Sequence, residues 1–169
     1  MASGSTKKTD DIANDRLAKP SSGDQILKSF DDRFAAITKR SLALLEHPRV
    51  SNAADAFYFH IARSAAEIEK AFGGITVRLW DDPFEWTLPE HLSTAAAIAD
   101  YIRTVDGTRR RGMEFIHNDA QLVQLIQAPT GLKLIFDVLF EAILRSEFEL
   151  GAAFALASDK RNVSCGDRA

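Results

Sequence analysis

The chain has 169 residues, of which 46% are hydrophobic and 27% charged, and its formal net charge is −3. This length and composition are typical of one globular domain, and the slightly acidic balance argues against nucleic-acid binding, which usually needs a basic face. No apolar run approaches the roughly 18 residues that a membrane-spanning helix requires, so we expect no membrane association.

Both ends of the sequence are polar and lack an apolar period. Residues 1–22 open on MASGSTKKTDD, which lacks the apolar stretch of a secretory signal. Residues 158–169 have the same character and hold the single cysteine, Cys165, which excludes an intrachain disulfide framework. We therefore expect a disordered N-terminal tail, a folded domain over residues 23–157, a flexible C-terminal tail and a cytoplasmic protein.

Two helices are predicted in the first half of the chain. The first runs from Asp24 to Glu46 and is ended by Pro48. The second begins after Ser51 or Asn52 and ends at Phe72, before a pair of glycines. Their apolar stripes, at spacings of three and four, are Ile26, Phe30, Phe34, Ile37, Ser41 and Leu44, and then Phe57, Ile61, Ala65, Ile68 and Phe72. The short connection between the two helices makes them antiparallel.

The second half predicts two more helices. Ser93 caps the third, whose apolar side carries Ile98, Ile102, Val105, Gly112 and Ile116, and whose run Arg109-Arg110-Arg111 indicates a solvated face. Residues 117–129 then turn, with a short helical piece over 120–126. The fourth helix, from Thr130 to Ala157, has apolar residues on more than one face, among them Phe136, Phe140 and Phe148. We expect the bundle and a second subunit to bury it, and so predict a homodimer.

About twenty residues without periodicity separate the second and third helices, and a loop of that length usually has a role. An extended chain covers ~3.3 Å per residue, so this loop can travel the length of a helix of roughly 30 Å. We therefore predict an all-α fold, a four-helix bundle with a long crossover loop between helices 2 and 3. Trp80, Phe84, Trp86 and Leu88 alternate along the loop; they either cover the core or form a lid that lines a pocket.

Four short stretches carry a resemblance to a known family. They are F-Y-F-H in the second helix, DDPFEWTLPE in the loop, L-S-T before the third helix, and R-S-E-F-E-L-G-A-A in the last helix. In this order they resemble the DinB-like (damage-inducible, YfiT-like) four-helix-bundle superfamily, over residues 24–157. The resemblance implies a crossover bundle that often forms a homodimer. Many members hold a divalent metal on three histidines, and several use it in thiol transfer with low-molecular-weight thiols.

The resemblance also places the family's three metal ligands on this chain. His60 stands at the first position, but Arg145 and Glu149 stand where the family has His-x-x-x-His. Residues four apart share a helix face and can share an ion, but a guanidinium has no lone pair to give. We therefore expect the usual metal site to be lost and no cofactor to be bound. If zinc or nickel is present, His60 and Glu149 are its expected ligands.

The candidate binding residues are His60, Arg145, Glu149, Glu67, Trp80 and Trp86, and each has a plainer alternative. His60 lies among aromatic residues and is as readily a packing histidine. Arg145 can pair with Glu149 or Glu141 on its own helix, or it can bind a carboxylate or another anion. We expect a small-molecule-binding or interaction protein. The alternative is a metal-dependent thiol transferase or hydrolase with an altered ligand set, using His60, Glu149 and Glu67.

Overall fold

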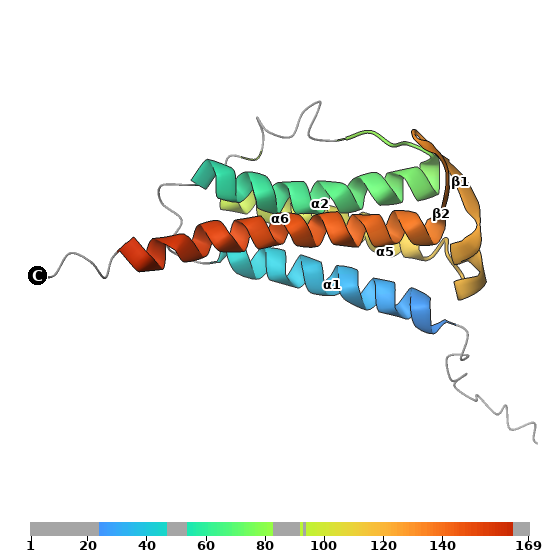
Figure 1. Cartoon of the computed structure of the whole chain (residues 1–169), viewed down its shortest axis with the longest axis horizontal. Coiled ribbons are helices and arrows are strands. Elements are labelled where there is room, and N and C mark those ends of the chain that lie inside the picture. The colour runs from blue at the N-terminus through green and yellow to red at the C-terminus, as the bar shows by residue number, and fades with distance from the viewer. Residues whose placement is uncertain (1–23, 47–53, 83–91, 93, 164–169) are drawn as a thin grey trace, which may run out of the picture.

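The computed structural model describes residues 24–46, 54–82, 92 and 94–163. In chain order its elements are α1 (Gln25–Leu45), α2 (Ala54–Val77), α5 (Ala95–Met113), the 3-10 helix η1 (Asp119–Val123), β1 (Leu125–Ala128), β2 (Gly131–Leu134) and α6 (Ile135–Val163). Figure 1 shows the long helices side by side, with the two strands and η1 across one end. The prediction of a mainly helical chain is confirmed, and a small antiparallel sheet is added to it.

The core lies between the long helices and is built mostly from the predicted stripes. Its largest members include Phe34, Phe57, Phe72, Ile61, Ile98 and Leu139. Phe34 and Phe72 meet edge to face with ring centroids 5.4 Å apart, a favoured aromatic geometry. A Cβ on Gly112 would stand 2.5 Å from the Phe72 ring, so glycine is what allows α5 to approach α2 there.

Two serines link α2 to α6 through hydrogen bonds. The Ser64 hydroxyl donates to the Ser146 carbonyl at 3.1 Å, and the Ser146 hydroxyl donates to the Ser64 carbonyl at 2.9 Å. Both side chains are fully buried, and their small size allows the helices to lie close together. The exchange satisfies two buried hydroxyls and fixes the register of the two helices, which run antiparallel.

The end of α2 differs from the prediction. We predicted that the helix stops at Phe72, but it runs on to Val77. It ends where Arg78 takes a positive φ of 58° and the Leu79 amide donates to the Gly73 carbonyl at 3.1 Å. A left-handed residue often ends a helix, although glycine usually takes that place. The glycine pair is therefore inside the helix and does not terminate it.

The segment before α6 also differs from the prediction. We predicted a helical piece over residues 120–126 and a helix from Thr130 onward. The structure instead has η1 over Asp119–Val123 and an antiparallel hairpin in which Leu125 faces Leu134 and Ala128 faces Gly131. Gly131 has φ +119°, a conformation that favours glycine, directly after the turn. Helix α6 begins only at Ile135, so Leu132 of the predicted stripe lies in β2 and is exposed.

The remaining boundaries are close to those predicted. Thr94 caps α5 by accepting a hydrogen bond from the Ala97 amide, and α6 continues past the predicted end at Ala157 to Val163. The predicted N-terminal tail and the loop residues Phe84, Trp86 and Leu88 lie outside the described residues. In the part of the chain that is described, no helix is both long and apolar enough to cross a membrane.

Candidate functional site

Charged and polar side chains line one side of the α2–α6 contact, at helical spacings of three and four. We call this set the polar strip. It consists of His60, Arg63, Glu67 and Lys70 on α2, and of Glu141, Arg145 and Glu149 on α6. The register that the two serines fix sets the members of one helix against those of the other.

His60 and Glu149 form one end of the polar strip. Nδ1 of His60 lies 2.6 Å from Oε2 of Glu149, and both side chains are partly buried. The His60 ring also meets the Phe59 ring edge to face, with centroids 5.4 Å apart. The structure thus brings together two of the residues that the family resemblance placed at one site.

Arg145 and Glu67 lie further along the polar strip. A guanidinium nitrogen of Arg145 is 3.7 Å from Oε2 of Glu67, whose other oxygen is 2.9 Å from Arg63. Glu67 is buried, whereas the Arg145 side chain is 60% exposed. The structure therefore pairs Arg145 with an acid on α2, while Glu149 bonds to His60 and Glu141 bonds to Lys133.

Asp82, at the start of the segment that leaves α2, folds back onto the polar strip. Its buried carboxylate accepts a hydrogen bond from Arg63 at 2.7 Å and lies 3.4 Å from Nζ of Lys70. Burial lowers the pKa of the Arg63 guanidinium, but the hydrogen bond to Asp82 and the charges of Glu67 and Asp82 outweigh it and raise that pKa above its ordinary value. Sequence reasoning missed Arg63, Lys70 and Asp82, although Arg63 stands four residues before Glu67 and so at ion-pair spacing.

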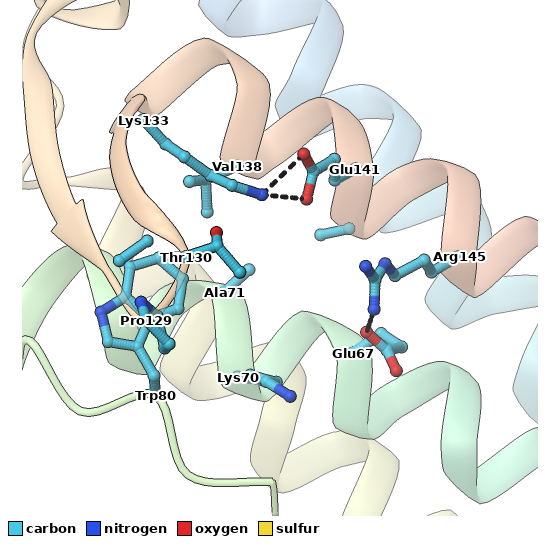
Figure 2. A pocket seen from close by; sticks show the side chains of 12 residues that line it. Glu67, Lys70, Ala71, Trp80, Pro129, Thr130, Lys133, Val138, Glu141 and Arg145 are labelled. Atoms are coloured by element: carbon cyan, nitrogen blue, oxygen red, sulfur yellow. Dashed lines mark hydrogen bonds and ion pairs between the residues drawn. The ribbon is translucent and has the colours of Figure 1, made fainter.

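A cavity of about 190 Å³ opens at the hairpin end of the polar strip, between α2, α6 and the β1–β2 turn (Figure 2). Its apolar surface comes from Ala71, Trp80, Ala128, Pro129, Val138 and Ala142. Its polar surface comes from Glu67, Lys70, Thr130, Lys133, Glu141 and Arg145. The cavity thus combines an apolar floor with a charged rim, the usual composition of a ligand pocket.

Trp80 forms one wall of this cavity and is held at two points. Its indole Nε1 donates to the Gln127 carbonyl of β1 at 2.9 Å. Its ring lies against α2 at Gly74, where an added Cβ would stand 2.6 Å from three ring carbons. Glycine at this position is therefore required to seat the indole on the helix.

The predicted site residues fall into two neighbouring groups. Trp80, Glu67 and Arg145 line the cavity, whereas His60 and Glu149 lie further along the polar strip. A second hollow connects the groups. Its lining includes Glu67 and Arg145 together with Arg63, Leu144, Phe148 and Glu149. Trp86, the remaining candidate, lies outside the described residues.

The residues at the ligand positions implied by the family resemblance do not fit a three-histidine metal centre. His60 is bonded to Glu149, and the remaining position holds Arg145, whose guanidinium has no lone pair for a metal. Glu67, the next acid, is held between two arginines. Within the described residues, no group of three or more His, Cys, Asp or Glu side chains is arranged to share an ion.

Comparison of the whole chain with known protein families, curated proteins and solved structures finds no match in any of the three.

Proposed function

We propose that this chain is a small-molecule-binding protein, a cytoplasmic four-helix bundle of the DinB-like type in which ion pairs replace the three-histidine metal site. The observation that carries the proposal is the cavity between α2, α6 and the hairpin, with an apolar floor, a charged rim and a fixed indole wall. Apolar linings with a few placed polar groups are typical of ligand sites.

Contacts at the hairpin end support the crossover topology. Phe72, near the end of α2, lies against Gly112, near the end of α5. Trp80, just beyond α2, bonds to Gln127 of the hairpin. Helices α2 and α5 therefore finish at the same end of the molecule, which is what a crossover connection between them would produce.

Ion pairing along the polar strip argues against the enzyme alternative. A metal-dependent thiol transferase or hydrolase with an altered ligand set would draw on His60, Glu149 and Glu67. Glu67 is neutralised by two arginines, and one of them, Arg145, would repel a divalent ion. A protein that binds its ligand without a metal accounts better for this arrangement of charges.

Helix α6 also carries an exposed apolar stripe that supports a homodimer. Phe140, Leu144 and Phe148 follow one another at intervals of four and are 46%, 52% and 74% exposed. A stripe of this kind is the sort of patch that a second subunit covers. Light scattering at micromolar concentration should therefore give a mass near twice 18.7 kDa, and a monomer mass would refute the dimer.

The small-molecule proposal is tested by blocking the cavity. Thr130 is exposed at the turn and lines the cavity, so Thr130→Phe should fill the space without disturbing the core. Fragments that bind the unmodified protein, as detected by ligand-observed nuclear magnetic resonance, should not bind this variant. They should still bind to Thr104→Phe, a matched change at an exposed threonine of α5. Fragment binding that survives Thr130→Phe, or a screen without hits, would overturn the proposal.

A further inference from the structure

The size of the cavity limits what it can hold. Its volume of about 190 Å³ is below the roughly 300–1,000 Å³ typical of ligand pockets. A protein cavity of about 150 Å³ is known to hold benzene. The space therefore suits one ring with a short substituent.

The Trp80 wall favours a flat ring. The indole is anchored to the Gln127 carbonyl and backed by Gly74, so it presents a rigid aromatic surface. Ala71, Val138 and Ala142 supply the apolar floor beside it. A flat ring can stack offset against the indole while its edge rests on these small side chains.

The charges around the cavity favour a negative substituent. Three cations but only two carboxylates line it. Both oxygens of Glu141 accept from Nζ of Lys133, at 2.8 and 2.7 Å, and the two oxygens of Glu67 are shared between Arg63 and Arg145. The acids are thus committed to cations already present, and an incoming cation would find no carboxylate that is not already paired.

Two of the cations make longer ion pairs than Lys133 does. Nζ of Lys70 is 3.4 Å from Asp82, and the Arg145 guanidinium is 3.7 Å from Glu67. An ammonium has three donors and a guanidinium has five, so each has donors to offer a ligand. Figure 2 shows the charged ends of Lys70 and Arg145 on the side of the cavity away from Trp80.

We propose that the cavity binds a single-ring aromatic carboxylate, with the ring against Trp80 and the carboxylate between Lys70 and Arg145. The inference rests on the proposed small-molecule function and deepens it by naming the ligand class. Two charge-assisted contacts at one end and a stacked ring at the other fix both ends of such a ligand.

The first arm of the test compares probes that differ in one property. Benzoate should bind about tenfold more tightly than benzyl alcohol or benzylamine, which keep the ring but lose or reverse the charge. It should also bind more tightly than acetate, which keeps the charge but lacks the ring. Binding is measured by isothermal titration calorimetry with the unmodified protein.

The second arm removes the cations. Lys70→Gln and Arg145→Gln should each weaken benzoate binding severalfold and leave benzyl alcohol binding unchanged. Arg103→Gln is the matched control, since Arg103 is 63% exposed on α5, against 60% for Arg145, and lies outside the cavity. It should leave benzoate binding unchanged.

The possible failures are distinguishable. If benzyl alcohol or benzylamine binds as tightly as benzoate, and Thr130→Phe blocks it, the carboxylate inference is wrong while the small-molecule site stands. If acetate matches benzoate, the ring is not recognised and the inference is again wrong. If no probe binds and the fragment screen is also empty, the inference and the proposed function fail together.

Discussion

Ser64 of α2 and Ser146 of α6 exchange hydrogen bonds, each hydroxyl donating to the other's carbonyl across the contact of two antiparallel helices. The pair lies between His60–Glu149 on one side and Glu67–Arg145 on the other. A change in spacing at the serines would therefore move both halves of the polar strip. The site depends on this contact although neither serine lines the cavity.

The first prediction tests the contact between the two serines by changing the size of the side chain at position 146. Ser146→Ala should cost about 1 kcal/mol of unfolding free energy, because it removes one buried hydrogen bond. Ser146→Leu should cost more, about 1–3 kcal/mol beyond the alanine variant, because the larger side chain has to force the helices apart. Urea denaturation measures both. Ser29→Leu, at an exposed position of α1, is the control, and an equal loss there would contradict the role of the serine pair.

The second prediction concerns neighbouring arginines of α5. Arg109 is 2% exposed and bonds to Asp106 and to Asp31 of α1, whereas Arg110 is 71% exposed and also reaches Asp106. Arg109→Met should cost about 3 kcal/mol, because it leaves a buried carboxylate without its buried partner. Arg110→Met should cost under about 1 kcal/mol, as exposed ion pairs do. If chemical denaturation gives the two variants equal losses of unfolding free energy, the burial of Arg109 does not make its ion pairs more stabilising than those of Arg110.

The helices that sequence predicted best are those with one buried face. In α1, for example, Phe30, Phe34 and Ile37 are all buried and recur at intervals of three and four residues. The apolar periodicity of the sequence is therefore enough to identify such a helix and its buried face. The prediction that the run Arg109-Arg110-Arg111 is solvated was wrong for Arg109, because three consecutive basic residues usually indicate an exposed surface. Successive residues of a helix point in different directions, and one of the three faces Asp31 on another helix.

The errors arose where a long-range contact decides the local structure. Gly74 resembles a helix terminator, but its role is to seat Trp80, and that need is not visible in neighbouring residues. No glycine or proline separates Leu132 from α6, so only the Pro129-Thr130-Gly131 turn could have indicated the hairpin. For the site, Glu67 and Arg145 were identified, but Asp82 was missed because its partners lie a dozen or more residues away on α2.

The third prediction is a pH dependence at Tyr101. Its hydroxyl donates to Glu69 at 2.6 Å. Burial, that hydrogen bond and the charge of Glu69 raise the pKa of Tyr101 well above its ordinary value. Because the folded-state pKa exceeds the unfolded one, this contribution to stability is complete below about pH 10 and is lost as pH rises further.

The measurement is urea denaturation at pH 8, 10 and 11. Above about pH 10 the unmodified protein should lose about 1.4 kcal/mol per pH unit more than Tyr101→Phe, which has no proton to release. Tyr58→Phe keeps Tyr101 and should follow the unmodified protein. Parallel curves for the protein and Tyr101→Phe would show that the hydroxyl is not held by Glu69.

The fourth prediction concerns metal. Zinc or nickel should not raise the melting temperature of the unmodified protein, because an ion stabilises a fold only by binding it. Arg145, which the family resemblance aligns with a metal ligand, is a cation paired with Glu67. The double change Arg145→His with Glu149→His removes the guanidinium and frees Nδ1 of His60 from its carboxylate partner. It also places two histidines four residues apart on the face of α6 that meets α2, where His60 lies.

Zinc should then stabilise the double variant, by about 2.7 kcal/mol when free zinc is one hundred times the dissociation constant. Arg145→His alone is the control and should respond weakly, because Glu149 still occupies His60. Differential scanning calorimetry with and without zinc measures the shift, and elemental analysis measures the metal content of the purified protein. Stoichiometric zinc in the unmodified protein would refute the metal-free reading of the polar strip and favour the metal-dependent enzyme.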